Sequence, residues 1–394
     1  MPDQTKPHLG LAQRAVPADP IPVSGSMLLD VIRFAAAVAV ALGHLSSPMF
    51  STHWPWLLNL ALSAVAVFFV LSGFVIRLIS IARSMTAADY AIDRISRIYS
   101  VLLPALLITI VVTLCLNLLP AGRIFRPGIS IPAIATQFFA CMTFVGSFWG
   151  LDVPMSFNTV FWSLSYECAY YAFYGIAFFG RRPWKWVLLS GLAILVGPPI
   201  LFMLPLWLFG CFICDAYHWL RRRKYPLTTY FGGILGLSLL ALILWATAVA
   251  LQRTSVAAAL RIHGRNLVQW THLHHLHLLQ RASLQGYFVG IPVGILIVGL
   301  LLAADHLAIS RKHASVSLVR RVADGTFTLY LIHLPLFILF AAYIPYDHAS
   351  SWQKLFLLAV TIAVAVALAG PTDVFKRWMR KALSSRLPQK APIP

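Results

Sequence analysis

Residues 27–45 read MLLDVIRFAAAVAVALGHL, an apolar stretch interrupted only by Asp30, Arg33 and His44. As a helix that rises 1.5 Å per residue it would be about 28 Å long, close to the ~30 Å hydrocarbon core of a bilayer. Arg33 and His44 are eleven residues apart. At about 100° per residue they share one face, about 16 Å apart along the axis. The stretch therefore predicts a transmembrane helix with a fixed cation at one depth and a titratable imidazole at another.

The rest of the chain has a similar composition. Of its 394 residues, 59% are hydrophobic and only 11% are charged, which is typical of a polytopic membrane protein. Because helices satisfy their own backbone hydrogen bonds in lipid, we predict an all-α, polytopic membrane helical bundle. About ten transmembrane helices are expected, at residues 27–45, 57–80, 99–119, 158–180, 185–200, 201–219, 228–252, 285–305, 324–345 and 353–371. One additional helix, in the apolar run 131–149, is expected to lie in the membrane interface.

The charges in the loops predict the orientation. The formal net charge is +19, but the 31 Lys and Arg residues lie at the ends of apolar runs and not on one soluble patch, so nucleic-acid binding is not expected. With 131–149 in the interface, the basic loops 181–185 and 221–224 face the cytoplasm, as the positive-inside rule requires. Both termini of this multi-pass protein are then cytoplasmic, in the cell (inner) membrane. The expected organisation is a flexible tail at 1–26, an integral membrane domain at 27–371 and a basic tail at 372–394.

Charged side chains within the spans are candidates for function. Each costs about 2.5 to 3.5 kcal/mol near the centre of a bilayer on insertion scales. Asp30 and Arg33 are three residues apart and are placed to pair. Arg94 and Arg97 also share a helix face and can clamp a phosphate. Anchoring at the membrane surface explains these two arginines equally well.

Glu167 is the only glutamate in the chain. In the expected topology it lies toward the outer side of the membrane, as His44 does. A carboxylate at that depth can orient an imidazole, hold its protonated form or bind hydroxyl groups of a substrate. Structural roles for both side chains are the alternative, with Glu167 beside a buried cation and His44 at a helix end.

Two further segments place polar groups among apolar ones. Ser72 and Gly73 lie between phenylalanines in the second span, where Gly73 lets helices approach closely and Ser72 can bond across the gap. Tyr330 and His333, three residues apart in the ninth span, put a phenol and an imidazole on one side of the helix. Pro335 lacks an N–H, so it frees a backbone carbonyl one turn earlier. For Ser72 and Gly73 in the second span, close helix packing is the default explanation.

Metal chemistry is not expected. The four histidines His272, His274, His275 and His277 have no nearby Cys, Asp or Glu and no standard ligand spacing. Cys211 and Cys214 form a C-x-x-C, but no second pair completes a zinc site. The sequence also lacks a Walker A motif, a nucleophile elbow and H-E-x-x-H.

Taken together, these segments resemble the acyltransferase 3 family of bacterial membrane proteins. The resemblance is carried by Leu29-Asp30 with Arg33-x10-His44; Phe68-Phe69-x-Leu71-Ser72-Gly73-Phe74; Arg94-x-x-Arg97; Trp162-Ser163-Leu164-x-x-Glu167; and Tyr330-Leu331-Ile332-His333-x-Pro335. It implies about ten transmembrane helices, an acyl-CoA donor that is usually acetyl-CoA, and His44 as the residue essential for transfer. The implied acceptors are sugars of surface polysaccharides, lipopolysaccharide and related glycans. One departure is Ala369-Gly370-Pro371 with Asp373, where many members have a Glu-Lys-Pro-like stretch.

The sequence therefore predicts a membrane O-acyltransferase that moves an acyl group, usually acetyl, from acyl-CoA to a glycan or glycolipid hydroxyl. The expected catalytic residues are His44 as general base and Glu167 as its orienting partner, with Arg33, Arg94 and Arg97 on the CoA phosphates. Other residues expected to line the site are Asp30, Ser72, Gly73, Trp162, Tyr330 and His333. The alternatives are a secondary transporter or flippase for a glycolipid or organic anion, and a scaffold without chemistry. Transporters often have duplicated halves, but the two halves of this chain share no motif.

Overall fold

The computed structural model describes residues 21–54, 57, 60–82, 85–118, 130–223, parts of 232–243, 284–307 and 314–386. Among these residues the regular structure is helical, with no named strand. The α-helices are α1 (Val23–Leu45), α2 (Leu60–Ala82), α3 (Ala87–Leu118), α4 (Ile131–Met142), α5 (Trp162–Phe179), α6 (Trp184–Val196), α7 (Pro198–Arg223), α11 (Leu284–Ala304), α12 (Ala314–Asp324), α13 (Thr326–Tyr343) and α14 (Ser351–Ser384). Two 3₁₀ helices, η2 (Val145–Gly150) and η3 (Thr159–Phe161), precede α5.

Seven of the described helices are long and apolar enough to cross a bilayer, namely α1, α2, α3, α7, α11, α13 and α14. The prediction of an all-α polytopic bundle is therefore confirmed, and the chain is a multi-pass membrane protein. Helix α5 does not combine the required length and hydropathy, and α6 has only 13 residues. The span expected at 228–252 lies largely outside the described residues. The total of ten spans stays a prediction.

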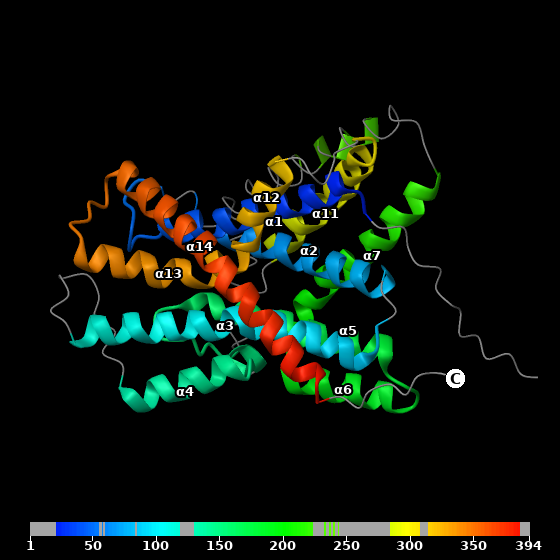
Figure 1. The fold of residues 1–394 in the computed structure, drawn as a ribbon, viewed down its shortest axis with the longest axis horizontal. Helices are drawn as coiled ribbons and strands as arrows, with labels where there is room; N and C mark the ends of the chain where they lie inside the picture. The colour runs from blue at the N-terminus through cyan, green and yellow to red at the C-terminus, as the bar shows by residue number, and fades with distance from the viewer. Residues whose placement is uncertain are drawn as a thin grey trace, which may run out of the picture.

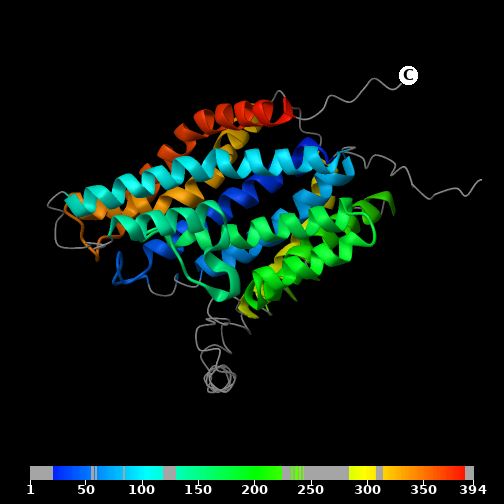
Figure 2. The same cartoon turned by 90° about the horizontal axis from the view of Figure 1, so that it is seen from below.

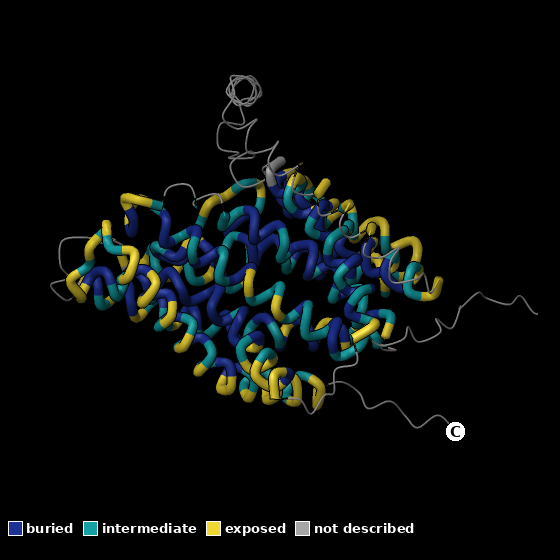
Figure 3. The backbone as a smooth tube through the Cα atoms, turned by 90° about the horizontal axis from the view of Figure 1, so that it is seen from above, coloured by how far each residue is buried: buried dark blue, intermediate teal, exposed yellow. Residues whose placement is uncertain are grey.

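Burial follows the pattern expected in lipid. The helices lie roughly side by side, and the buried positions run through the middle of the bundle while exposed positions cover its outside (Figures 2 and 3). Helix α6 exposes Trp184, Val187, Ile194 and Leu195, all large apolar side chains. Such a surface suits hydrocarbon and would be a liability in water.

Two helices begin earlier than the sequence predicts. Helix α1 starts at Val23, directly after Pro22, so Arg33 lies in the middle of a 23-residue helix and not at its end. Helix α3 starts at Ala87, twelve residues before the predicted 99. Its first turn is fixed by Thr86 and Asp89, whose side chains each accept from the other's backbone N–H at 3.1 Å. Arg94 and Arg97 are therefore inside the helix.

Helix α14 also continues past its predicted end. The basic tail expected from residue 372 is helical through Ser384, so Pro371 lies inside the helix. Asp373 pairs with Lys376 and Arg377 of the same helix, at 3.6 and 2.5 Å. Figure 1 shows α14 crossing the front of the bundle diagonally, and Arg380 near its end lies 3.6 Å from Asp93 of α3.

The apolar run 131–149, which is expected to form one interfacial helix, is divided between α4 and η2. Helix α4 has 12 residues, about 18 Å at 1.5 Å per residue, which is too short to cross the membrane. The chain then turns through η2 toward α5. A second short helix, α12, is not expected from the sequence; it buries Val316 and Ala323 against the bundle and exposes Leu318.

Helices α2 and α7 cross at two glycines. A Cβ atom on Gly73 would lie 2.0 Å from the carbonyl oxygen of Trp207, and one on Gly210 would lie 2.1 Å from that of Val70. The Sγ of Cys211 also contacts the carbonyl oxygen of Gly73 at 3.3 Å. Only glycine allows this approach, so the prediction that Gly73 packs helices together is confirmed.

One end of the bundle, which we call the loop end, is formed by residues 46–54 and 344–350 (left in Figure 1). The backbone N–H of Thr52 donates to the carbonyl oxygen of His348 at 3.2 Å, and the hydroxyl of Tyr346 donates to that of Phe50 at 2.9 Å. His44, in the last turn of α1, lies directly beneath these loops. The first residues of α1 and the last residues of α14 lie toward the opposite end.

Candidate active site

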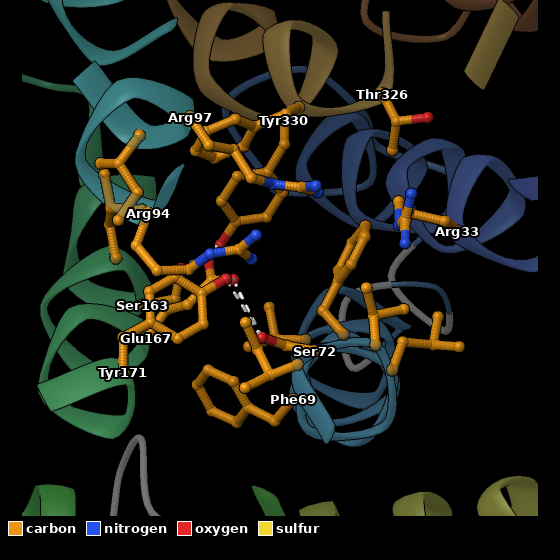
Figure 4. Close-up of a pocket in the computed structure, with 18 residues that line it drawn as sticks. Arg33, Phe69, Ser72, Arg94, Arg97, Ser163, Glu167, Tyr171, Thr326 and Tyr330 are labelled. Atoms are coloured by element: carbon orange, nitrogen blue, oxygen red, sulfur yellow. Dashed lines mark hydrogen bonds between the residues drawn. The ribbon is translucent and has the colours of Figure 1, made fainter. Parts of the chain in front are cut away.

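A pocket inside the bundle gathers three arginines from two helices. Arg33 of α1 and Arg94 and Arg97 of α3 line a cavity of about 80 Å³, together with Glu167 of α5 and Tyr330 of α13. Figure 4 shows the three guanidinium groups pointing into the same space. The lining holds three guanidinium groups and one carboxylate, and guanidinium groups suit the oxygens of an anionic ligand.

The three arginines have different partners. Arg33 lies 3.5 Å from Asp30, which confirms the predicted pair. Arg94 is buried, pairs with Asp93 and stacks 5.6 Å over the ring of Tyr171. Within the described part of the chain, Arg97 has no carboxylate within 4.0 Å. The guanidinium of Arg97 is therefore available to a ligand that enters the pocket.

Glu167 belongs to this pocket and not to His44. Its Oε1 accepts from the hydroxyl of Ser72 at 3.1 Å and from that of Tyr171 one turn along α5 (Figure 4). The hypothesis that Glu167 orients His44, which rested on shared depth, is therefore corrected. Glu167 shares the pocket with Arg33, which lies three turns of α1 away from His44. The predicted role of Ser72 in bonding across a helix gap is confirmed.

The partner of His44 is a second histidine. Nδ1 of His44 lies 3.0 Å from Nε2 of His333 in α13, and the two ring centroids are 5.0 Å apart. His333 is fully buried and its ring also packs edge-on against Phe337. His44 is partly exposed and is therefore less deeply buried than His333. The pair lies near the loop end of the bundle.

Tyr330 connects the arginine pocket with the histidine pair. Its hydroxyl lies 2.6 Å from that of Ser163, and both residues line the pocket. One turn farther along α13 is His333, whose ring centroid is 6.3 Å from that of Tyr330. The pocket and His44 are thus consecutive along one side of α13.

Other residues expected to line the site lie around it. Asp30 holds Arg33 and Gly73 contacts α7, and neither forms the pocket wall. Trp162 packs edge-on against Tyr166 at 5.1 Å between ring centroids. The four histidines at 272–277 lie outside the described residues. No group of three or more His, Cys, Asp or Glu side chains suited to a metal occurs in the described part.

Asn158 is a site residue that the sequence analysis missed. Its Nδ2 donates to the carbonyl oxygen of Leu331 at 2.9 Å and to Oγ1 of Thr109 at 3.1 Å. The Leu331 carbonyl lies one turn before Pro335, which cannot supply the usual helical N–H. A side-chain amide takes the place of that missing donor. Asn158 thereby ties the segment before α5 to the turn that carries His333.

We expect Asn158→Leu to lower the free energy of unfolding by about 1–3 kcal/mol, because the buried Leu331 carbonyl loses its donor. Pro335→Ala restores an N–H that reaches the same carbonyl through the helix. The loss caused by Asn158→Leu should therefore be smaller in the Pro335→Ala background. Thermal unfolding in detergent of the two single variants and the double variant measures the difference. Equal losses in both backgrounds would contradict this explanation.

Comparison with known families agrees with this geometry. Residues 28–370 match the acyltransferase 3 family model, which is described as an acyltransferase domain. The chain belongs to this family. The match runs through the described bundle from Leu28 to Gly370, so the acyltransferase domain and the membrane domain are the same unit. Searches of curated proteins and of solved structures give no match.

Membership of the acyltransferase 3 family supports membrane O-acyltransferase activity for the chain over the transporter alternative. In this acyltransferase, His44 and Arg33 are carried by one helix and are separated by three turns. The arginine pocket and the histidine pair are the two chemical centres of the described bundle.

Proposed function

We propose that this protein transfers an acyl group, acetyl in the first instance, from acyl-CoA to a hydroxyl of a glycan or glycolipid, with His44 as general base. The observation that carries the proposal is the alignment of an arginine-lined pocket and a partly exposed histidine along one side of α13, in a chain of the acyltransferase 3 family.

The donor would approach from the arginine side. CoA carries several phosphates, and the charge-assisted hydrogen bonds of guanidinium groups suit them. The positive-inside rule favours a cytoplasmic position for this side of the bundle, where CoA is available. In this proposal the nucleotide would stay at the mouth of the pocket while the pantetheine arm enters between Arg33 and Arg97.

The acyl group would react at the level of His44. The helix rise between Arg33 and His44 is about 16 Å, which the extended arm has to cover. His44 takes the proton of the acceptor hydroxyl as its oxygen bonds to the thioester carbon. The carbon–sulfur bond then breaks, and the proton passes to the CoA thiolate. The acceptor enters from the loop end, so donor and acceptor meet inside the bundle without a flipped CoA.

Two measurements test the proposal. The purified protein in lipid vesicles should release CoA from acetyl-CoA only when an acceptor glycan is present. Mass spectrometry of surface glycans from cells with and without the gene should show the loss of one acyl substituent. Unchanged glycans, together with no acceptor-dependent CoA release, would contradict the proposed function.

A further inference from the structure

The contacts of the two histidines determine which ring nitrogen carries each proton. Nδ1 of His333 lies 3.1 Å from the carbonyl oxygen of Leu329. A carbonyl oxygen only accepts, so this nitrogen has to carry a hydrogen. In a neutral imidazole the other nitrogen then has a lone pair, so Nε2 of His333 accepts.

The hydrogen-bond-accepting nitrogen of His333, Nε2, determines which tautomer His44 adopts. Nδ1 of His44 lies 3.0 Å from Nε2 of His333 and 3.1 Å from the carbonyl oxygen of Val40. Both neighbours are acceptors, so Nδ1 of His44 carries the hydrogen and shares it between them. Nε2 of His44 is left with the lone pair. The reverse arrangement would need a doubly protonated His333 in a fully buried position.

We propose that His333 is a positioning residue that holds His44 in the tautomer whose Nε2 is the base. This inference rests on the proposed function, since it says how the same site keeps its base ready. His333 acts through His44 and does not contact the substrate. A carboxylate does this in Ser-His-Asp triads, where the wrong tautomer costs several powers of ten in rate. Here a neutral imidazole would do so without adding a buried charge.

The surroundings of His333 fit this role. Its ring is held by the Leu329 carbonyl on one side and by Phe337, at 5.6 Å between centroids, on another. The Asn158 amide fixes the next turn of the same helix through Leu331. A side chain held by two ring contacts on a braced helix turn can set the orientation of a partly exposed neighbour.

The test compares variants at position 333 in the full-length protein reconstituted with acetyl-CoA and acceptor. His333→Leu removes the ring nitrogen that accepts the hydrogen bond from His44, and it should lower kcat about 10- to 100-fold. The KM for acetyl-CoA should stay within about twofold of the parent value. His333→Gln offers an amide oxygen near the position of Nε2 and should recover most of that loss. His218→Leu, which removes a buried histidine of α7 that does not line the pocket, is the matched control and should leave kcat unchanged.

Non-additivity with His44 gives a second readout. In a His44→Ala background, His333→Leu should cause no further loss, because a positioning residue acts only through the base. If the His333→Leu protein does not fold, the inference is tested by comparing the kcat of His333→Gln with that of His333→Asn. The shorter Asn amide cannot reach Nδ1 of His44. The expected order is then Gln more active than Asn.

Three results would overturn the inference. They are a folded His333→Leu protein with the parent kcat, a His333→Gln protein no more active than His333→Leu or His333→Asn, and a further loss in the His44→Ala background. A fully active His44→Ala protein would instead overturn the proposed function itself. An inactive His44→Ala protein with an active His333→Leu protein would overturn only the role of His333.

Discussion

Replacing His44 by alanine is expected to abolish acyl transfer and to leave donor binding intact. A positioned general base contributes about 10²- to 10⁴-fold to a rate, so kcat should fall by at least two powers of ten. The Arg33, Arg94 and Arg97 side chains are separate from His44, so the affinity for acetyl-CoA should stay within about twofold. Acceptor-dependent CoA release and direct binding of acetyl-CoA measure the two effects.

The control for this substitution is His218→Ala, which removes an imidazole from α7. Its ring packs 5.2 Å from that of Tyr217, outside the arginine pocket. The control should keep the parent kcat. A His44→Ala protein that expresses normally and transfers at the parent rate would remove His44 from the mechanism.

Replacing Arg97 by alanine is expected to act on the donor. Arg97 faces the pocket and, among the described residues, has no carboxylate partner, so its loss leaves no internal charge unpaired. A hydrogen bond to a charged group contributes about 1.5–3 kcal/mol, so KM for acetyl-CoA should rise about 10- to 100-fold. Initial rates at a series of acetyl-CoA concentrations measure the change.

Two variants complete this experiment. Arg97→Lys keeps the charge but loses the planar fork, so its KM should lie between those of the parent and of Arg97→Ala. Arg182→Ala removes an exposed arginine from the loop before α6 and should leave KM unchanged. An unchanged dependence on acetyl-CoA in the Arg97→Ala protein would exclude Arg97 from the donor site.

Much of the fold follows from the sequence because long apolar runs allow few structures in lipid. Hydropathy predicts the positions of α1, α2, α7 and α13 closely in this way. It predicts the ends of helices less well. Hydropathy detects only apolar runs, so it misses turns that polar side chains cap, as Thr86 and Asp89 do before α3. It also places an end at Pro371, where the helix continues.

The candidate site is only partly predictable from the sequence. Residues three apart on one helix share a face, so spacing alone brings Arg94 and Arg97 together. The expected pairing of Glu167 with His44 is wrong because the depth inferred from apolar runs is too coarse: Glu167 lies in the pocket with Arg33, three turns of α1 from His44. The contact between His44 and His333 joins residues 289 positions apart, and no spacing rule reaches that far. Asn158 escapes notice because its partner is a backbone carbonyl.

The diagonal course of α14 brings one of the last turns of this helix next to the arginine pocket. Arg380 lies 3.6 Å from Asp93, and Asp93 in turn pairs with Arg94 in the pocket wall. The sequence predicts only a basic tail at 372–394. In the described part of this segment Arg380 adds a second cation beside Asp93, so removing the end of α14 is expected to change the charge next to Arg94 in the arginine pocket.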